Sequence, residues 1–376
     1  MASITTEATE EDRTMLARAL ELARLGRGAV SPNPPVGAVL LRDGEVIGEG
    51  HHARLGGLHA EVAALDDARA RGHDPRGATL YVSVEPCAHQ GRQPPCTDAI
   101  LAAGIERVVI GCDDPSDKAS GRGPGILRDG GVTVAFADGA DAAAARRAIQ
   151  PFRKHARTGR PLVTLKSALS LDGFTATASG EPRWISGPES RALVHRWRAE
   201  ADTICVGIGT ALADDPLLTA RDTPEPGRQP LRVIFDSAAR LPLDSQLVQT
   251  VAEAPVIVVA EAGADAARIA ALRAAEVEVV AVEGDRAARI GAALDALGAR
   301  PVTSLLLEGG AELAGSFLDA GEVDELALFV APILLGAGRP LAIRERGDDA
   351  EAERPLALEW QTSGEDLLAR ARMREW

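Results

Sequence analysis

The chain has 376 residues, of which 45% are hydrophobic and 26% are charged, and this length suggests two domains. The composition excludes a largely disordered chain, and a net charge of −14 disfavours nonspecific binding to nucleic acid or to an anionic membrane. Four cysteines, the lack of a long apolar run and a polar N-terminus without a signal-peptide pattern favour a reducing, cytoplasmic location. We expect a small-molecule substrate, no nucleic-acid or membrane partner, and a homo-oligomer.

The first half alternates between helical and strand-like segments, which indicates a layered α/β domain. A first helix is expected after Thr9, where acidic residues follow a capping residue and apolar residues recur at helical spacing up to Gly26. Arg42-Asp43-Gly44 predicts a hairpin. The later elements are strands at 36–41, 45–50, 78–84 and 107–111, helices at 59–71, 96–103 and 141–149, and a long irregular binding loop or lid at 112–131.

A basic, turn-prone segment at 153–160 is the expected domain boundary. We therefore assign residues 1–150 to a first domain and residues 158–376 to a second. The second half alternates in the same way as the first. Its expected strands are 161–169, 203–206, 231–235, 255–260, 277–282 and 304–307, and its expected helices are 187–199, 265–275, 286–297 and 311–320.

Three short pieces of the first half carry the residues of a catalytic zinc site: His59-Ala60-Glu61, Pro86-Cys87 and Cys96. Such a site takes three protein ligands and keeps one position open for water, and His59, Cys87 and Cys96 supply one nitrogen and two thiolates. Glu61 follows His59 by two residues and would lie on about the opposite helix face, where it can move protons instead of binding the metal. Zinc nucleobase deaminases have this pattern, but here eight residues separate the cysteines instead of two.

Two other interpretations of these residues stay open. The cysteines could be buried apolar side chains, with His59 exposed to solvent, or His89 could add a fourth ligand and make the zinc structural. Two cysteines within one ten-residue window argue against the first interpretation, and the second leaves Glu61 without a role. The other two cysteines, Cys112 and Cys205, end apolar runs and are expected in the core.

The first half resembles the deaminase half of the bifunctional riboflavin-biosynthesis deaminase/reductase family. The matching motifs are Ser31-Pro32-Asn33-Pro34-Pro35-Val36-Gly37, His59-Ala60-Glu61 and Glu85-Pro86-Cys87-Ala88-His89-Gln90-Gly91-Arg92-Gln93-Pro94-Pro95-Cys96. This resemblance implies a cytidine-deaminase-like three-layer α/β/α domain with Glu61 as the catalytic residue, and it favours His52 over its neighbour His51. The implied substrate contacts are Asn33, His52, His89 and Arg92, the last standing where many relatives have lysine.

The second half has no Rossmann dinucleotide fingerprint. In Gly207-Ile208-Gly209-Thr210-Ala211-Leu212 the third glycine is replaced by Leu212, and no acid follows in a second strand. The turn Glu308-Gly309-Gly310 follows an apolar run and opens a helix, where backbone N–H groups can hold a phosphate. An ordinary strand-to-helix turn explains this segment equally well.

The second half nevertheless resembles the reductase half of the same family, through the segments 166–173, 184–186, 213–221 and 308–310. The resemblance implies a dihydrofolate-reductase-like α/β domain that binds NADPH. The implied NADPH contacts are Ala168, Trp184, Thr210, Asp214, Ser237, Gly310, Ala311, Glu312, Leu313, Ala314, Gly315 and Ser316. The implied substrate contacts are Lys166, Pro182, Arg198, Leu218, Arg221 and Glu308, with Pro182 standing where a serine is common.

The resemblance also implies the reactions. A zinc-dependent hydrolytic deamination of 2,5-diamino-6-(5-phosphoribosylamino)pyrimidin-4(3H)-one is followed by NADPH-dependent reduction of its ribosyl side chain to ribityl. Arg198 and Arg221 could each grip a phosphate through two parallel hydrogen bonds, although composition alone makes both of them surface residues. The alternative is a single-activity nucleoside or nucleobase deaminase with a ligand-binding second half. A zinc-structured nucleic-acid-binding module is disfavoured by the acidic charge and the 3% of aromatic residues.

Overall fold

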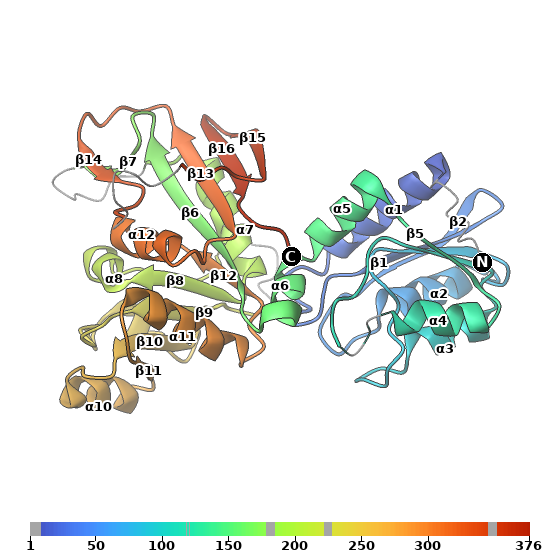
Figure 1. Cartoon of the computed structure of the whole chain (residues 1–376), viewed down its shortest axis with the longest axis horizontal. Coiled ribbons are helices and arrows are strands. Elements are labelled where there is room, and N and C mark those ends of the chain that lie inside the picture. The colour runs from blue at the N-terminus through green and yellow to red at the C-terminus, as the bar shows by residue number, and fades with distance from the viewer. Residues whose placement is uncertain (1–8, 118, 120, 178–184, 222–227, 345–351) are drawn as a thin grey trace. The chain divides into compact units, whose positions relative to one another are not determined.

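A computed structural model describes residues 9–117, 119, 121–177, 185–221, 228–344 and 352–376. The chain divides into two compact units, residues 1–159 together with Trp376, and residues 160–375 (Figure 1). Trp184 and Pro182 lie outside the described residues. None of the described helices combines the length and the hydropathy that a membrane span requires.

The first unit is built on a five-stranded sheet in the order β2-β1-β3-β4-β5. β1 runs antiparallel to both β2 and β3, whereas β3, β4 and β5 are parallel. The strands are β1 (Gly37–Arg42), β2 (Glu45–His51), β3 (Thr79–Val82), β4 (Arg107–Ile110) and β5 (Thr133–Phe136). The helices are α1 (Glu10–Arg24), α2 (Ala60–Ala70), α3 (Cys96–Ala103), α4 (Arg122–Asp129), α5 (Gly139–Ala148) and α6 (Gln150–Thr158).

Alternating side chains of β1 separate the two helical layers of this unit. Ala38 and Leu40 face a core formed with α2, α3 and α4, whereas Val39 and Leu41 face α1. On β2, a Cβ atom at Gly50 would lie 2.4 Å from Ala64 N, so α2 packs directly on the strand backbone. The first unit is therefore the expected three-layer α/β/α domain, with α2 held tightly against its sheet.

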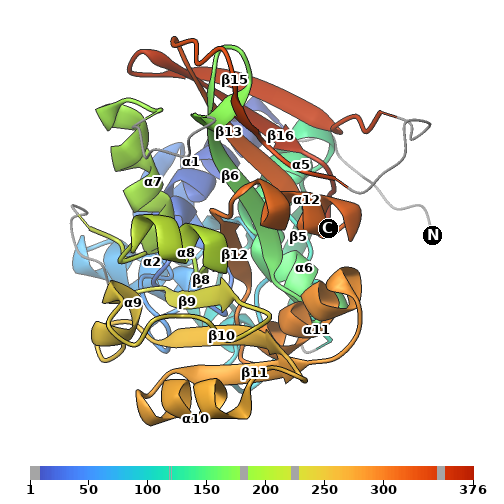
Figure 2. The ribbon, with the colours of Figure 1, turned by 90° about the vertical axis from the view of Figure 1, so that its left-hand side faces the viewer.

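The second unit contains a nine-stranded sheet in the order β11-β10-β9-β8-β12-β6-β13-β16-β15, and a two-stranded sheet of β7 and β14 (Figure 2). The strands from β11 to β13 are parallel, and the hairpin of β15 and β16 is antiparallel. The strands are β6 (Leu162–Ser170), β7 (Phe174–Thr177), β8 (Thr203–Gly207), β9 (Leu231–Phe235), β10 (Val256–Glu261), β11 (Glu278–Val282), β12 (Ser304–Leu307), β13 (Glu325–Ala331), β14 (Gly338–Pro340), β15 (Ala357–Ser363) and β16 (Asp366–Arg372).

Helices cover both faces of the large sheet (Figure 2). One core joins the sheet to α11 and α12, and the other joins it to α8, α9 and α10. The helices are α7 (Pro188–Glu200), α8 (Ile208–Asp214), α9 (Gln246–Gln249), α10 (Ala266–Ala274), α11 (Arg286–Gly298) and α12 (Ala311–Asp319). Both units are therefore the α/β domains that the sequence predicts.

Two segments expected to be irregular are helical. The loop predicted at 112–131 contains α4, whose Pro124 lies in the first turn, where its missing N–H costs no helical hydrogen bond. The turn-prone segment at 153–160 mostly belongs to α6. This helix buries Arg153 and Lys154. Its packed face therefore contains two cations, and a search for apolar residues at helical spacing does not detect it.

Candidate active sites

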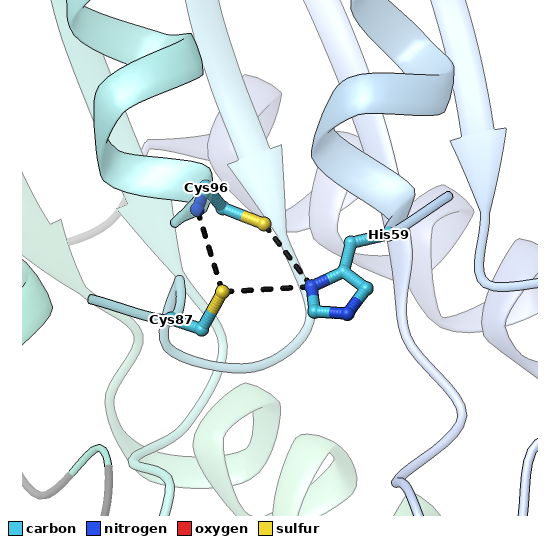
Figure 3. Close-up of side chains that lie close together, drawn as sticks. All are labelled: His59, Cys87 and Cys96. Carbon is cyan, nitrogen blue, oxygen red and sulfur yellow. Dashed lines mark hydrogen bonds between the residues drawn. The ribbon is translucent and has the colours of Figure 1, made fainter. Parts of the chain in front are cut away.

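Three side chains from separate segments converge in the first unit (Figure 3). His59 directly precedes α2, Cys96 is the first residue of α3, and Cys87 lies between β3 and α3. His59 Nδ1 lies 3.2 Å from Cys96 Sγ and 3.5 Å from Cys87 Sγ, and all three ligand atoms lie within 4.8 Å of one another. A tetrahedral zinc with bonds of about 2.1 Å to nitrogen and 2.3 Å to sulfur spaces its ligands by roughly 3.5–3.8 Å. The three residues therefore fit a zinc ion.

The surroundings of Cys87 favour its ionised form. The Cys96 thiol lowers the pKa of Cys87 by hydrogen bonding, against the effect of burial, and His59 and the Cys96 backbone N–H lower it further, to about 4. Hydrogen bonding to Cys87 and burial raise the pKa of Cys96. These contacts favour the thiolate of Cys87, the form in which cysteine binds a metal.

Glu61 lies beside the same sulfurs. It is the second residue of α2 and is 3% exposed. Burial raises the pKa of its carboxyl to about 7, helped by the charge of Cys87, while a hydrogen bond with Cys96 acts the other way. The prediction of opposite helix faces is wrong, because His59 has an extended backbone (φ −74°, ψ 158°) outside the helix. This extended backbone at His59 brings the side chains of His59 and Glu61 to one site.

Asn33 and His52 form a pair next to this cluster. His52 is 3% exposed, and its ring centroid lies 5.2 Å from that of His59. Its Nδ1 lies 2.9 Å from the carbonyl oxygen of Leu58 and must donate, so Nε2 accepts from Asn33 Nδ2 at 3.2 Å. Burial lowers the pKa of His52. A neutral imidazole and an oriented amide therefore line this side of the site.

His89 lies within the segment between the two cysteines. Its Nδ1 is buried and has no hydrogen bond to any part of the chain that the structure describes. The nearby Asp114 carboxyl has its pKa raised by burial and lowered by Ser116 and by His89. Arg92, in contrast, is exposed. Sequence reasoning missed Asp114, and the only signal for it was its place in the Asp-rich segment after Cys112.

In the second unit, Lys166, Arg198 and Glu308 form a buried ion cluster. Arg198 Nε and Nη2 donate to the two Glu308 carboxylate oxygens at 2.7 and 2.9 Å, and Lys166 Nζ lies 3.5 Å from Oε2. Burial acts to raise the pKa of Glu308, but the two cations lower it to about 2. The two parallel donors of Arg198 therefore hold Glu308 in this structure.

Leu218 and Arg221 lie in the segment that follows α8. Leu218 is buried with a positive φ of 50°, and Arg221 is exposed. Arg221 Nη1 donates to Thr219 Oγ1 at 3.2 Å, and Arg198 Nη1 donates to Thr219 O at 3.4 Å. These contacts bring the expected substrate residues Arg198, Leu218 and Arg221 to one place beside the ion cluster.

Two helices start where parallel strands of the second unit end. α8 follows β8 after Gly207, and α12 follows β12 after Gly310, and neither cap residue makes a side-chain capping hydrogen bond. A Cβ atom at Gly310 would lie 3.4 Å from Thr210 Oγ1, so the two helix starts adjoin. Their backbone N–H groups and helix dipoles fit the phosphates of a dinucleotide.

The other expected cofactor residues are more dispersed. Ala168 is half-buried on β6, whereas Asp214 ends α8, Ser237 follows β9, and both are exposed. Ala314 and Gly315 are buried in α12, and a Cβ atom at Gly315 would lie 1.8 Å from Ile343 O. Gly315 is therefore packed against the chain itself.

Comparisons with known proteins agree with both sites. Residues 9–112 match the cytidine and deoxycytidylate deaminase zinc-binding region, and residues 161–369 match the RibD C-terminal domain. The chain is 38% identical over 361 residues to the riboflavin biosynthesis protein RibD of Aquifex aeolicus, which covers 96% of this chain and 98% of that protein. The chain belongs to the RibD family. Its fold also matches RibD of Acinetobacter baumannii, with a TM-score of 0.85, 35% identity and coverage of 97% of this chain and 99% of that chain.

A second RibD-like structure is similar over the whole chain. It comes from Thermotoga maritima, is described as a diaminohydroxyphosphoribosylaminopyrimidine deaminase/5-amino-6-(5-phosphoribosylamino)uracil reductase, and is 34% identical, with a TM-score of 0.83 and coverage of 96% of this chain and 99% of that chain. As a RibD-family enzyme the chain carries a zinc-dependent deaminase domain and an NADPH-using reductase domain. The predicted bifunctional enzyme is confirmed, and the single-activity deaminase is not favoured.

Proposed function

We propose that the chain deaminates 2,5-diamino-6-(5-phosphoribosylamino)pyrimidin-4(3H)-one and then reduces the ribosyl group of the product to a ribityl chain. The observation that carries the proposal is the convergence of His59, Cys87 and Cys96 beside the buried Glu61. Its setting in a RibD-family chain with a second, reductase domain supports the presence of a second reaction in the same chain.

In the first reaction, one water is consumed and one ammonia is released. His59, Cys87 and Cys96 would hold a zinc ion, which would supply a water of lowered pKa for attack on the amino-bearing ring carbon. Glu61 moves two protons from the attacking water: it passes the first to the ring nitrogen, and the second, taken from the hydroxyl that has added to the carbon, to the leaving amine. The carbon–nitrogen bond breaks and a carbonyl takes its place. The substrate is held by Asn33, His52, His89 and Arg92.

The second reaction needs no metal from this chain. NADPH supplies the hydride that opens and reduces the ribosyl group. Lys166 can donate the accompanying proton, since its ammonium lies 3.5 Å from the buried Glu308 carboxylate and points into the same cluster. Arg221 and Leu218 hold the substrate, and Arg198 fixes Glu308. We propose that NADPH is held by Thr210 and the start of α12, with Ala168, Trp184, Asp214 and Ser237.

A two-step assay combined with metal analysis tests this function. We expect about one zinc per chain, ammonia release from the pyrimidine ribotide, and NADPH oxidation only after the first product has formed. Ammonia release without any NADPH oxidation would support the single-activity deaminase instead. Neither reaction in a zinc-loaded protein would contradict the proposal as a whole.

We also propose a homo-oligomer in the cytoplasm. Leu358 and Trp360 on β15 are 48% and 60% exposed, and Leu367 on β16 is 46% exposed on the same face, at the end of the large sheet. Apolar patches of this kind are often covered by a second subunit. The free thiols of Cys87 and Cys96 suit a reducing compartment. Light scattering is expected to give a multiple of the chain mass of 39.2 kDa, and a monomer would contradict the oligomer.

A further inference from the structure

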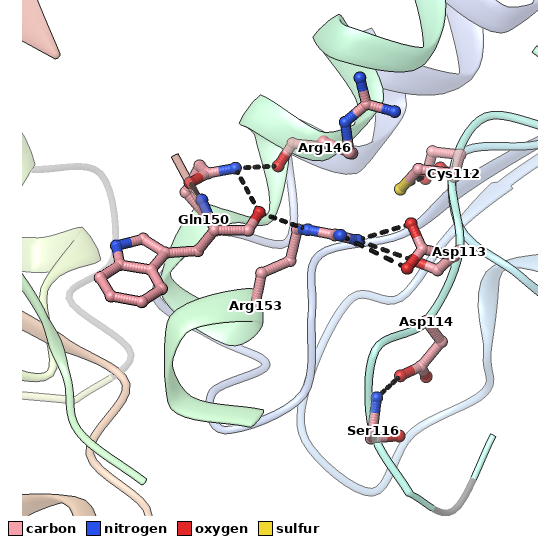
Figure 4. A network of polar contacts seen from close by, with 9 residues as sticks. Cys112, Asp113, Asp114, Ser116, Arg146, Gln150 and Arg153 are labelled. Atoms are coloured by element: carbon pink, nitrogen blue, oxygen red, sulfur yellow. Dashed lines mark hydrogen bonds and ion pairs between the residues drawn. The ribbon is translucent and has the colours of Figure 1, made fainter. Parts of the chain in front are cut away.

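We propose that Arg153, on α6, is a positioning residue of the deaminase site and that Trp376 holds its guanidinium in place. This inference rests on the proposed deamination and extends it to residues that touch neither metal nor substrate. Arg153 is 2% exposed, although it lies in a segment that the sequence predicts to be basic and turn-prone (Figure 4). Burying a guanidinium costs free energy unless its N–H donors have acceptors, so the acceptors of Arg153 indicate what it holds in place.

The first partner is Asp113, in the segment that follows β4. Arg153 Nη1 donates to Asp113 O at 3.1 Å and to Oδ1 at 2.9 Å, and Nη2 donates to Oδ2 at 3.3 Å (Figure 4). One guanidinium thus fixes both the main chain and the side chain of a single residue. Charge-assisted bonds of this number hold a loop more firmly than a neutral contact does.

The residues on both sides of Asp113 lead directly to the metal cluster. Cys112 O accepts the backbone N–H of Glu85 at 2.9 Å, and burial raises the pKa of the Glu85 carboxyl while the Asp114 backbone acts to lower it. Glu85 is 5% exposed and precedes Cys87 by only two residues. The segment 112–114 therefore braces the chain that carries one of the candidate zinc ligands.

Asp114 also faces the expected substrate side of the site. Its carboxylate accepts the Ser116 backbone N–H at 2.8 Å (Figure 4). Its charge also interacts with His89. His89 Nδ1 is buried without a hydrogen bond among the described residues, as expected of a group that meets substrate. A displacement of Asp113 would carry Asp114 away from His89.

The second partner of Arg153 comes from the far end of the sequence. Arg153 Nε donates to Trp376 O at 2.6 Å. Gln150, one turn earlier on α6, pairs with both backbone groups of Trp376, accepting its N–H at 2.8 Å and donating to its carbonyl at 3.1 Å. The Lys154 ammonium lies 5.3 Å from the centre of the indole ring. These contacts hold the Nε side of the guanidinium, while its Nη atoms are directed toward Asp113.

The test compares Arg153→Met with Arg157→Met, a control that removes an exposed arginine one turn later on the same helix. For Arg153→Met we expect the KM of deamination to rise about tenfold or more, with kcat changed by less than about threefold, because substrate contacts shift while the metal ligands stay. Zinc content and the reduction of separately supplied deaminated product should stay at the wild-type level. Arg157→Met should match the wild type in every measurement.

Two further variants keep the test decisive if Arg153→Met folds poorly. Arg153→Lys keeps one charge on Asp113 but cannot serve both partners, so we expect a KM between those of the wild type and Arg153→Met. Gln150→Ala leaves Arg153 and Asp113 unchanged but removes the side chain that holds both backbone groups of Trp376, and it should raise the KM of deamination about threefold, without effect on reduction.

Three outcomes would overturn the inference. The first is a deamination KM in Arg153→Met, Arg153→Lys and Gln150→Ala equal to that of Arg157→Met. The second is a joint loss of zinc, kcat and thermal stability with KM unchanged, which marks a purely structural role. The third is an equal loss of reduction. A wild-type protein that releases no ammonia would instead refute the proposed function.

Discussion

Replacing Glu61 with Gln separates proton transfer from metal binding. The side chain keeps its size, but it can no longer accept a proton, and it is not one of the three side chains whose ligand atoms converge. General acid–base groups contribute about 10²–10⁴-fold to rate, which is about 3–5 kcal/mol of barrier. Because Glu61 is 3% exposed, bulk water cannot replace it easily, and we expect a loss near the upper end of that range.

The same substitution should change stability in a direction that follows from the pKa. Burial raises the pKa of Glu61 from 4.5 to about 7 in the protein without metal, so the folded state binds the proton more tightly than the unfolded state does. Stability is therefore lost as pH rises from 4.5 through 7, and the shift corresponds to about 3 kcal/mol above this range. Glutamine removes this cost. After chelation, Glu61→Gln should be more stable than the wild type at alkaline pH and equal to it below pH 4.5.

Two measurements check this reasoning. Ammonia release by zinc-loaded Glu61→Gln should be almost lost, while zinc content and NADPH oxidation with supplied deaminated product stay unchanged. Denaturant unfolding of the chelated proteins across pH should show the two stability curves separating as pH rises. A deamination rate within about tenfold of the wild type would refute the proton-transfer role of Glu61. Stability curves that stay parallel across pH would refute the electrostatic origin of the stability difference.

Three other perturbations address the rest of the molecule. Glu308→Gln leaves Arg198 buried without its counter-charge, so we expect the second unit to lose about 3–5 kcal/mol of stability and the chain to lose reduction, with ammonia release retained. Gly50→Ala places a Cβ 2.4 Å from Ala64 N and must push α2 from its strand, so deamination should fall about tenfold or more while reduction persists. For Asp12, burial acts to raise the pKa, but its hydrogen-bonded arginine and its helix cap lower it from 3.8 to about 2. Asp12→Asn should therefore cost stability above pH 3.8, and thermal unfolding should show the difference from the wild type vanishing as pH falls through 2, whereas a constant difference would contradict an ionic origin.

The candidate zinc cluster was readable from the sequence because its parts are short and chemically distinctive. His59 directly precedes a helix and Cys96 starts one, and these helix starts carry ordinary sequence signals, whereas Cys87 is marked by the preceding Pro86. The placement of Glu61 in the same site as His59 could not be predicted from the sequence, because it depends on the extended backbone of one residue, His59, at the helix start. Helical spacing assumes that both residues belong to the helix, which is untrue of His59.

Other features lack any local signal. The face that α6 buries contains Gln150, Arg153 and Lys154, which a hydrophobic pattern assigns to solvent. β15 is exposed along most of its length and so lacks the alternation that marks a half-buried strand. The pairing of Arg198 with Glu308 joins residues 110 positions apart. Such contacts depend on the assembled sheet, and sequence spacing does not encode them.

The stretch from residue 88 to residue 95 is closed at its base by its own neighbours. Cys96 N donates to Cys87 Sγ at 3.3 Å, and Thr97 N donates to Cys87 O at 3.2 Å. Because the two ends are tied to each other, the residues between them can change in length and character without moving the sulfurs. Exchanging this stretch for that of another deaminase is thus a route to a new substrate preference that leaves the hydrolytic chemistry intact.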